Sequence, residues 1–364
     1  MKKVLTIFGT RPEAIKMAPV VKELQKRSEV EDIVCITAQH KTMLYQVLDA
    51  FSIKPDYDLD IMEPNQTLGM ITSKVISGIE EVIDKEKPDV VLVHGDTTTA
   101  MAGCLAAFYK QVKIGHVEAG LRTYDKYSPF PEEINRQIID TMADYLFTPT
   151  DMSAKNLGEK LNRGQRIYIT GNTAIDALKT TVTDNYTNET LNWADDSRLI
   201  LLTAHRRENL GEPMEHIFNA INRLTDYFPD VKVIYPVHMN PKVREIASRV
   251  LKDNNKVKLI DPLDVIDFHN FMKKSYLIMS DSGGVQEEAP SLGKPVLVLR
   301  DTTERPEGVE AGTLKLVGTN EDDIFNAAKL LLEDKDEYDK MSKSINPYGD
   351  GLASKYIVDA LLKN

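Results

Sequence analysis

The chain has 364 residues, which is more than one compact core usually holds, so we expect two domains. Apolar residues make up 42% and charged residues 28% of it, as in a soluble globular protein. The formal net charge of −11 argues against a nucleic acid or an anionic membrane as partner, because both require a basic face. A local basic pocket for a small phosphate ligand is still compatible with this charge.

The N-terminal residues do not predict a signal peptide. Their apolar run ends at Phe8 and meets Arg11, whereas a signal peptide needs roughly 7–15 apolar residues and a small-residue cleavage site. No stretch approaches the roughly 20 apolar residues of a membrane span. Cys35 and Cys104 lie in apolar segments without the spacing of a metal or redox motif, which predicts buried free thiols. We therefore expect a cytoplasmic protein.

Short apolar segments alternate with helical patterns along the whole chain. Strands are expected at Val4–Phe8, Asp32–Ala38, Val90–His94, Lys113–Val117 and Tyr145–Thr148, and then at Leu199–Thr203, Val231–Val237, Val257–Ile260, Leu277–Ser280 and Pro295–Leu299. Helices between the first strands are expected at Ala14–Arg27, Thr98–Tyr109 and Pro131–Ala143. Several strands are continuous apolar runs, as expected when helices cover both faces. The alternation predicts α/β domains with parallel sheets.

A domain boundary is expected in the polar, strandless region that includes Thr181–Ser197. We assign residues 1–172 to an N-terminal Rossmann-like domain, joined by a C-terminal helix at 350–364, and residues 173–349 to a C-terminal Rossmann-like domain. In each half, polar residues directly follow the predicted strands. Open parallel sheets bind ligands there, so two such halves facing each other would form one cleft.

The segment DSGGVQEE, residues 281–288, joins a predicted strand to a helix. Gly283 and Gly284 let backbone N–H groups approach a ligand, and a helix N-terminus attracts anions, which predicts a diphosphate cradle. An ordinary turn capped by Ser282 is an equally good interpretation. The segment is neither a Walker loop nor a G-x-G-x-x-G fingerprint, so ATP and NAD have no support. Glu287 and Glu288 would repel a phosphate, so a carboxylate at this place is better suited to bind ribose hydroxyls.

Two histidine–carboxylate pairs follow strands of the first half, His94 with Asp96 and His116 with Glu118. Residues two apart share a strand face, so the four side chains are compatible with a metal site or with a metal-free acid/base cluster. Structural hydrogen bonding is equally compatible. The zinc deaminase interpretation is excluded, because no P-C-x-x-C follows His116-x-Glu118.

The helix expected to begin at Pro131 carries Glu132 and Arg136, whose spacing usually means a solvent-exposed ion pair. The long loop before it, residues 121–130, could fold over a ligand.

Several basic residues follow buried strands closely. Arg11, Arg206 and Arg207 suit phosphate oxygens, and Lys16 lies one turn into the first helix. His205 and His238 close apolar strands of the second half. Lone histidines there are often structural, but His205 lies beside two arginines.

Taken together, these segments resemble the non-hydrolysing UDP-N-acetylglucosamine 2-epimerase family. The resemblance covers essentially the whole chain, in the expected order: FGTRPEAIKMAPV, VHGDTTTAMA, GHVEAGLRT, SPFPEEINR, ITGNTAIDAL, HRREN, DSGGVQEEAPSLGKPVLVLRDTTERPE and NPYGDG. It implies a glycosyltransferase-B-type α/β fold, with two Rossmann-like domains whose parallel sheets face a central cleft. It also implies a bacterial enzyme that interconverts UDP-GlcNAc and UDP-ManNAc without a cofactor.

The implied reaction has two stages. UDP leaves C1 with loss of the C2 proton, giving bound 2-acetamidoglucal, and then adds back with reprotonation on the other face. Elimination fits a chain without an NAD fingerprint, because the C2–H bond is not next to a carbonyl. It requires cations on the diphosphate, a base at C2 and an acid on the opposite face.

The resemblance also assigns site residues, in three groups. The residues given to acid/base chemistry and to assisting the leaving group are Asp96, Glu118, Glu132, His205 and Arg136. The residues given to substrate binding are Arg11, Lys16, Phe268, Ser282, Gly283, Gly284, Glu288 and Arg305, with Phe268 along the uracil ring and Glu288 on the ribose. The residues given to a second, regulatory UDP-GlcNAc site are Gln39, Arg207 and His238. No metal ligand is assigned, and which carboxylate acts on which face of C2 is left open.

Other activities stay open at this point. They are a hydrolysing epimerase that releases N-acetylmannosamine and UDP, a UDP-sugar glycosyltransferase of the same fold, a nucleotide-sugar sensor, and a metal hydrolase. From the resemblance alone we expect a homodimer, and a product that feeds teichoic acid or another envelope polysaccharide.

Overall fold

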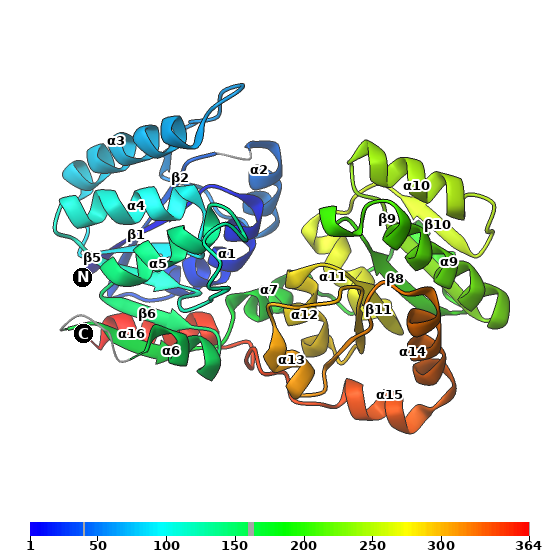
Figure 1. Cartoon of the computed structure of the whole chain (residues 1–364). Coiled ribbons are helices and arrows are strands. Elements are labelled where there is room, and N and C mark those ends of the chain that lie inside the picture. Colours follow the sequence, from blue (N-terminus) through cyan, green and yellow to red (C-terminus); the bar gives the residue numbers. More distant parts are fainter. Residues whose placement is uncertain (39–40, 159–163, 364) are drawn as a thin grey trace. The chain divides into compact units, whose positions relative to one another are not determined.

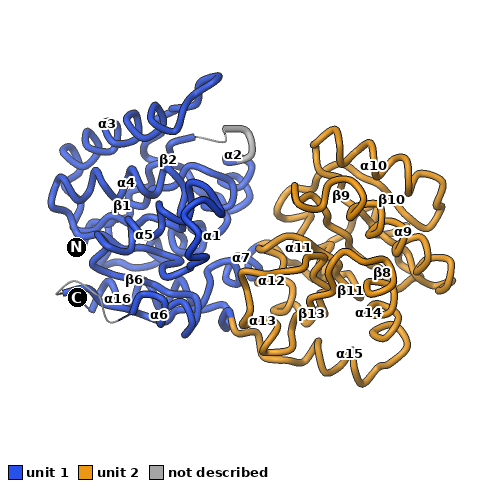
Figure 2. The backbone as a smooth tube through the Cα atoms, in the orientation of Figure 1, with its two compact units in different colours: residues 1–180, 348–364 blue, residues 181–347 orange. Residues whose placement is uncertain are grey.

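The computed structural model describes residues 1–38, 41–158 and 164–363, with no account of the side chains of 41–43. The chain forms two compact units, Met1–Thr180 with Tyr348–Asn364, and Thr181–Pro347 (Figure 2). The first division therefore falls after Thr180, whereas the sequence suggested residue 172. Helix α7 (Thr173–Thr181), which covers the intervening residues, is hydrogen-bonded to the C-terminal helix α16 (Ala353–Leu362) of the first unit.

The first unit is built on a parallel sheet of seven strands (Figure 1). Their order is β3-β2-β1-β4-β5-β6-β7, so the sheet grows outward from β1 and β4 in both directions. The strands are β1 (Lys2–Phe8), β2 (Val30–Ile36), β3 (Tyr57–Asp58), β4 (Val90–His94), β5 (Lys113–Val117), β6 (Tyr145–Thr148) and β7 (Arg166–Ile169).

Helices cover both faces of this sheet. The described helices of the unit are α1 (Arg11–Gln25), α2 (Lys41–Ala50), α3 (Leu68–Glu86), α4 (Thr98–Tyr109), α5 (Glu132–Met142), α6 (Asp151–Leu157), α7 (Thr173–Thr181) and α16 (Ala353–Leu362). Helices α3, α4 and α5 pack side by side over one face, where their apolar residues form a core with β1, β4 and β5 (Figure 1). Helix α1 packs against both α2 and α16. The β-strands are therefore buried from both sides, as their apolar sequences predicted.

The second unit repeats the plan with six parallel strands, in the order β10-β9-β8-β11-β12-β13. The strands are β8 (Arg198–Thr203), β9 (Val231–Pro236), β10 (Val257–Ile260), β11 (Leu277–Ser280), β12 (Val296–Val298) and β13 (Leu314–Leu316). Its helical segments are α8 (Glu189–Asn192), η1 (Arg207–Asn209), α9 (Glu212–Tyr227), α10 (Pro241–Leu251), α11 (Val265–Lys274), α12 (Gly283–Glu288), η2 (Ala289–Leu292), α13 (Pro306–Glu310), α14 (Glu321–Glu333) and α15 (Lys335–Ser342). A core of residues from α9, α10 and α14 packs on one face of the sheet.

The predicted α/β class, with parallel sheets in two Rossmann-like units of glycosyltransferase-B type, is confirmed. The predicted strands are all present, although three short strands, β3, β7 and β13, were missed because few of their residues are fully buried. Helix α1 begins at Arg11 and not at Ala14, because Thr10 and Glu13 form a capping box that satisfies the first N–H groups.

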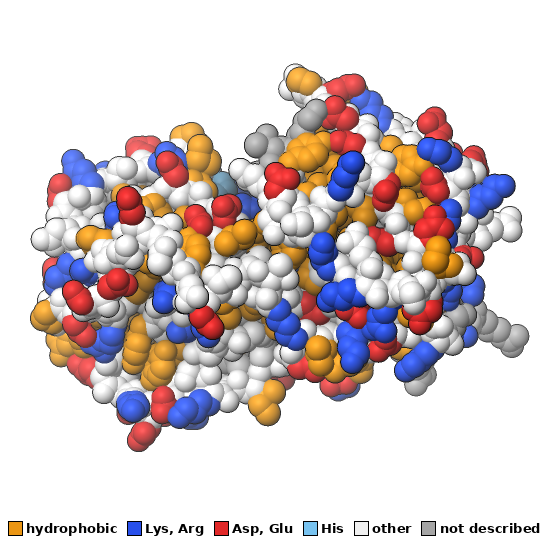
Figure 3. All heavy atoms as spheres, turned by 180° about the vertical axis from the view of Figure 1, so that it is seen from behind, with side chains coloured by type: hydrophobic (Ala, Val, Ile, Leu, Met, Phe, Trp, Pro, Cys, Tyr) orange, Lys and Arg blue, Asp and Glu red, His pale blue; other side chains and the backbone are white. Residues whose placement is uncertain are grey.

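Cys35 and Cys104 are buried free thiols, as predicted. No helix in the described ranges is long and apolar enough to cross a membrane. Acidic and basic side chains are intermixed over the face shown in Figure 3.

Helix α16 is tied to the first unit by a carboxylate from α7. Asp176 accepts hydrogen bonds from the backbone N–H groups of Ala353 and Ser354, at 3.1 and 2.8 Å, and from the Ser354 hydroxyl. The residue that precedes α16, Leu352, offers no side-chain cap, so Asp176 supplies the missing acceptor from elsewhere in the chain.

We predict that Asp176→Ala lowers the free energy of unfolding of the first unit by about 1–3 kcal/mol, because it leaves buried N–H donors unsatisfied. Urea unfolding followed by circular dichroism measures the change. Ser354→Ala removes only the hydroxyl donor and should have a smaller effect. Equal losses in the two variants would contradict a capping role for Asp176.

Candidate active site

In each sheet the strand order reverses between two neighbouring strands, β1 and β4 in the first unit and β8 and β11 in the second. Loops that leave such neighbours run to opposite sides and open a crevice at the carboxyl edge of the sheet, which is where doubly wound folds bind ligands. Several of the predicted site residues lie in the loops and helix starts that follow these strands, among them Arg11, Asp96, His205, Ser282, Gly283 and Gly284.

In the first unit, Asp96 follows β4 and is held by helix α5. Its carboxylate forms a close ion pair with Arg136, and its backbone carbonyl accepts a hydrogen bond of 2.9 Å from Asn135. The Asp96 side chain keeps about a quarter of its surface exposed, while Arg136 is nearly buried. The carboxylate is therefore fixed in direction but accessible.

Glu118 follows β5 in a left-handed backbone conformation, with φ of 67°. Such a conformation is unfavourable for a residue with a side chain, and its presence at a strand end is typical of a functional position. The carboxylate forms a close ion pair with Lys16, accepts a 2.9 Å hydrogen bond from Asn172, and lies 3.6 Å from Nε2 of His94.

The protonation of Glu118 is governed by these neighbours. Burial raises the pKa of Glu118, but the Lys16 ammonium and His94 outweigh burial and hold this pKa well below its usual value. Glu118 is therefore ionised in the free protein. Lys16, predicted to hold a diphosphate, here contacts one of the predicted acid/base residues.

His116 belongs to a second buried network. Its Nδ1 lies 2.7 Å from Asp140 and its Nε2 lies 2.7 Å from the carbonyl oxygen of Gly95. Arg122 approaches the other oxygen of Asp140 to 2.6 Å. Although burial raises the pKa of Asp140, the charges of His116 and Arg122 bring it below its usual value. Both ring nitrogens of His116 therefore face acceptor oxygens.

The metal site that the sequence left open from His94, Asp96, His116 and Glu118 is contradicted by the register of the sheet. Val93 pairs with His116, whereas His94 pairs with Val117. Because side chains alternate along a strand, the two imidazoles point to opposite faces of the sheet. Across the described ranges, no group of three or more histidine, cysteine, aspartate or glutamate side chains is arranged to hold a metal ion.

The expected surface pair of Glu132 and Arg136 does not form. Arg136 is turned inward to Asp96 and lies 3.4 Å from Glu133, which is fully buried. Glu132 is half-buried and makes no hydrogen bond or ion pair with another described residue. Its neighbour Glu133 accepts backbone hydrogen bonds from Thr123 and Tyr124, and so anchors the loop 121–130.

Arg11 is the first residue of α1 and is half-buried at the end of β1. The turn before it is fixed by Glu13, which accepts from the N–H groups of Gly9 and Thr10, at 3.0 and 2.8 Å. Glu13 also accepts a 2.7 Å hydrogen bond from the Thr97 hydroxyl, beyond β4. One carboxylate thus links the turns that follow β1 and β4.

In the second unit, Asp281 follows β11 and is fully buried. One of its oxygens accepts hydrogen bonds from the N–H groups of His205 and Arg206, both 2.8 Å, and from the Asn209 side chain, 3.1 Å. Burial raises the pKa of Asp281, but His205 and these backbone donors lower it below its usual value. The turn after β8 is therefore tied to the turn after β11.

His205 and His238, predicted for different sites, stack on each other with ring centroids 5.3 Å apart. Burial and the nearby His205 lower the pKa of His238. Arg207, predicted to share a regulatory site with His238, lies exposed in η1. Gln39, the third residue of that predicted site, lies outside the described residues.

Gly283, which follows β11, lies close to an arginine. A Cβ atom on Gly283 would lie 2.9 Å from the guanidinium of Arg305, so a larger residue would require the arginine to shift. Arg305 is paired through Nε with the buried Glu287, at 2.7 Å. Glu287 is therefore compensated by Arg305, which removes most of the repulsion that a glutamate would exert on a phosphate. Ser282 is the N-cap residue of α12 but makes no side-chain capping bond.

The residues predicted for the nucleoside lie near one another. Glu288 contacts His269 at 3.5 Å, and the ring of Phe268 lies 6.5 Å from the ring of His269. His269 is itself held at 2.6 Å by the Thr181 hydroxyl. A carboxylate and a half-buried aromatic ring are therefore brought together through one histidine.

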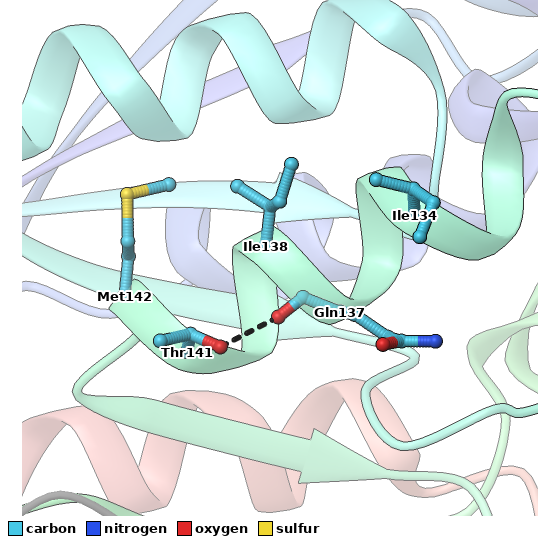
Figure 4. A pocket seen from close by; sticks show the side chains of 5 residues that line it. All are labelled: Ile134, Gln137, Ile138, Thr141 and Met142. Carbon is cyan, nitrogen blue, oxygen red and sulfur yellow. Dashed lines mark hydrogen bonds between the residues drawn. The ribbon is translucent and has the colours of Figure 1, made fainter. Parts of the chain in front are cut away.

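An apolar hollow on α5 is separate from these side chains. It is lined by residues on the outer face of the helix: Ile134, Gln137, Ile138, Thr141 and Met142 (Figure 4). Asn135 and Arg136 leave the same helix on the side that contacts Asp96. Helix α5 therefore presents its polar face to the candidate site and an apolar face elsewhere.

Two doubly wound units with charged side chains at both strand reversals define the class of protein: an enzyme of glycosyltransferase-B-type fold. Residues 22–362 match the family described as UDP-N-acetylglucosamine 2-epimerase. The chain belongs to this family.

Individual relatives align with this chain over nearly their whole length. The UDP-N-acetylglucosamine 2-epimerase of Bacillus subtilis is 62% identical over 99% of this chain and 95% of that protein. The enzyme of Neisseria meningitidis, solved with UDP-GlcNAc bound, is 51% identical with a TM-score of 0.90 and full coverage of both chains. The enzyme of Methanocaldococcus jannaschii, solved with UDP-GlcNAc and UDP, is 35% identical with a TM-score of 0.81 and the same coverage.

Sequence reasoning missed several residues that hold the site together. They are Glu13, Glu133, Asp140, Asn172 and Asp281. Asn172 comes just after β7, so recognising that strand would have drawn attention to it. Glu13 stands at a capping-box position. The partners of Asp140 and Asp281 lie far away in the sequence, where no local pattern points to them.

We predict that Asp140→Asn lowers the free energy of unfolding at pH 7 by about 3–5 kcal/mol, because it leaves the nearly buried guanidinium of Arg122 without its counter-charge. Since the pKa of Asp140 is depressed on folding, its contribution is present above the ordinary aspartate pKa of about 4 and is lost as pH falls through the folded value. The difference between wild type and variant should therefore shrink on acidification.

Urea unfolding of both proteins between pH 7 and pH 3 measures this difference. Asp84→Asn, which breaks an exposed pair with Lys110, serves as the control and should be neutral. A difference that grows as pH falls would contradict the assignment.

Proposed function

We propose that the enzyme reversibly epimerises UDP-N-acetylglucosamine to UDP-N-acetylmannosamine at C2, without hydrolysis. The observation that carries this proposal is the pair of fixed, charge-compensated carboxylates, Asp96 and Glu118, at the carboxyl edge of the first sheet in a member of this family. The relatives solved with UDP-GlcNAc and UDP support the choice of substrate.

The proposed reaction runs through elimination and re-addition. A carboxylate removes the C2 proton while the C1–O bond breaks, its electrons leave with UDP, and a C1–C2 double bond forms in 2-acetamidoglucal. UDP then adds back to C1 as a proton is delivered to the other face of C2. Asp96, Glu118 and Glu132 are the proposed acid/base set.

The ionisation of Glu118 suits a base that accepts the first proton. Its pair with Lys16 keeps it anionic before substrate binds. Asp96 is likewise paired with a cation, Arg136. Glu132, which has no cation as partner in the described part of the chain, can take up and release a proton without breaking an ion pair.

The second unit is proposed to hold UDP. Arg305 with Ser282, Gly283 and Gly284 would bind the diphosphate, and His205 would assist beside the leaving group. Glu288 would accept hydrogen bonds from the ribose hydroxyls while Phe268 lies along the uracil. The approach of Arg305 to Gly283 and the contact of Glu288 with His269 support this arrangement.

Further parts of the proposal rest on the family resemblance alone. They are a homodimer, a regulatory UDP-GlcNAc site that includes Arg207 and His238, a cytoplasmic location, and supply of teichoic acid or another envelope polysaccharide. Hydrolysis to N-acetylmannosamine and UDP, or glycosyl transfer, are the alternatives that the first experiment separates.

Proton NMR of UDP-GlcNAc incubated with the protein in D2O tests the proposal. We expect anomeric signals of UDP-ManNAc, with deuterium at C2, because the glycal is reprotonated from solvent. Free N-acetylmannosamine with UDP would establish the hydrolysing reaction instead. An unchanged spectrum from folded protein that binds UDP would overturn the proposed activity.

Asp96→Asn should lower kcat by about 10²–10⁴-fold, because it removes the charge of a proposed acid/base group and keeps its shape. The dissociation constant of UDP, measured by calorimetry, should change little. Asp84→Asn carries the same chemical change on the surface of the same unit and should keep full activity. A wild-type kcat in Asp96→Asn would remove Asp96 from the mechanism.

A further inference from the structure

The side chain of His205 stands over a buried carboxylate. Its Nδ1 lies 3.1 Å from Oδ1 of Asp281, while the imidazole keeps about a third of its surface exposed. The other oxygen of Asp281 accepts from the backbone N–H of His205 itself. Asp281 therefore fixes both the backbone and the ring of the same histidine.

Among the described residues, His205 is the one placed to donate a hydrogen bond to the Oδ1 atom of Asp281. This oxygen is buried and receives no hydrogen bond within the described ranges, while Nδ1 of His205 lies 3.1 Å away. A buried carboxylate oxygen without a donor is costly, and an unprotonated Nδ1 would turn a lone pair toward it. A hydrogen on Nδ1 of His205 satisfies this oxygen.

The remaining neighbours of the ring do not compete for Nδ1. His238, at the end of β9, stacks on the ring of His205 with an angle of 13° between the planes, so it contacts the face and not the edge. The Nδ1 of His238 accepts a 3.1 Å hydrogen bond from the N–H of Asn240. Tyr235 on β9 directs its hydroxyl to the carbonyl of Ala204, at 2.6 Å. Among these neighbours, Asp281 is therefore the acceptor that faces Nδ1 of His205.

We propose that Asp281 is a positioning residue of the epimerase: it holds His205 with hydrogen on Nδ1, so that Nε2 is the nitrogen presented to the ligand. This inference rests on the proposed function, in which His205 assists departure of UDP. Asp281 itself is fully buried and touches no substrate.

This arrangement suits a residue that assists both the departure of the diphosphate and its return to C1. With Asp281 ionised below, a protonated His205 directs its Nε2–H at an oxygen on which negative charge develops. The opposite tautomer would leave Nδ1 facing the carboxylate as a lone pair. Asp281 therefore decides which nitrogen is available and in which direction it points.

The tautomer can be measured directly on the whole protein labelled with 15N-histidine. A His205→Asn variant identifies the His205 resonances by their loss among the seven histidines. We expect a protonated Nδ1 in the wild type, whether the ring is neutral or cationic. An unprotonated Nδ1 would overturn the proposal, even if the protein proves to be an epimerase.

Asp281→Asn retains an oxygen for the backbone donors but turns an NH2 group toward Nδ1, which should shift the hydrogen of His205 to Nε2. We expect kcat to fall by about 10²–10⁴-fold, as when the orienting carboxylate of a catalytic histidine is lost. In a His205→Asn background the same change should have little further effect, because both act through one ring.

Asp230→Asn is the matched control, since Asp230 pairs with Arg198 at the opposite end of the same strand, β8. It should leave both the His205 resonances and kcat unchanged. If Asp281→Asn proves unfolded by circular dichroism, the wild-type spectrum still decides the question. Wild-type kcat in folded Asp281→Asn, or additive effects with His205→Asn, would overturn the proposal. Absence of epimerase activity in the wild type would instead refute the proposed function and leave the measured tautomer standing.

Discussion

Compensation of buried carboxylates is the constraint on which both units depend. The carboxyl edge of a parallel sheet collects polar groups, yet its walls are apolar strands and helices in which an isolated charge is costly. Glu118 is stabilised by Lys16, Asp96 by Arg136, and Asp281 by backbone N–H groups and His205. Each compensating group comes from a different element, so the same contacts that ionise the site also join the elements around it.

This coupling explains why the site tolerates local strain. Glu118 takes a left-handed backbone conformation, which is unfavourable for any residue except glycine. The ion pair with Lys16 and the hydrogen bond from Asn172 fix the side chain in this place. Because these partners come from α1 and from the loop after β7, the folded unit supplies the energy that a short peptide could not.

The sequence was sufficient for most of the strands and for the sheet edge that carries the predicted site residues, because continuous apolar runs and the polar residues that follow them are local signals. It was insufficient to predict which side chains contact each other. His94 and His116 looked equivalent, but an offset of one residue between β4 and β5 sends them to opposite faces of the sheet. Similarly, i,i+4 spacing suggested Glu132 for Arg136, whereas packing of α5 on the β4 turn selected Asp96. Register and helix packing are long-range properties, and no local pattern encodes them.

In both units a buried carboxylate lies at the same topological position, where the strand order reverses. Glu13 in the first unit accepts from the N–H groups after β1 and from Thr97 after β4. Asp281 in the second accepts from the N–H groups after β8 and itself follows β11. In both, a buried carboxylate bridges the strands at which the order reverses and draws in the N–H groups of the first turn. The chemistry differs because of what stands beside the bridge: Glu13 leaves Asp96 and Glu118 free to carry charge of their own, whereas Asp281 gives its remaining oxygen to a histidine. A shared scaffold constraint is therefore compatible with an acid/base surface in one unit and an oriented imidazole in the other.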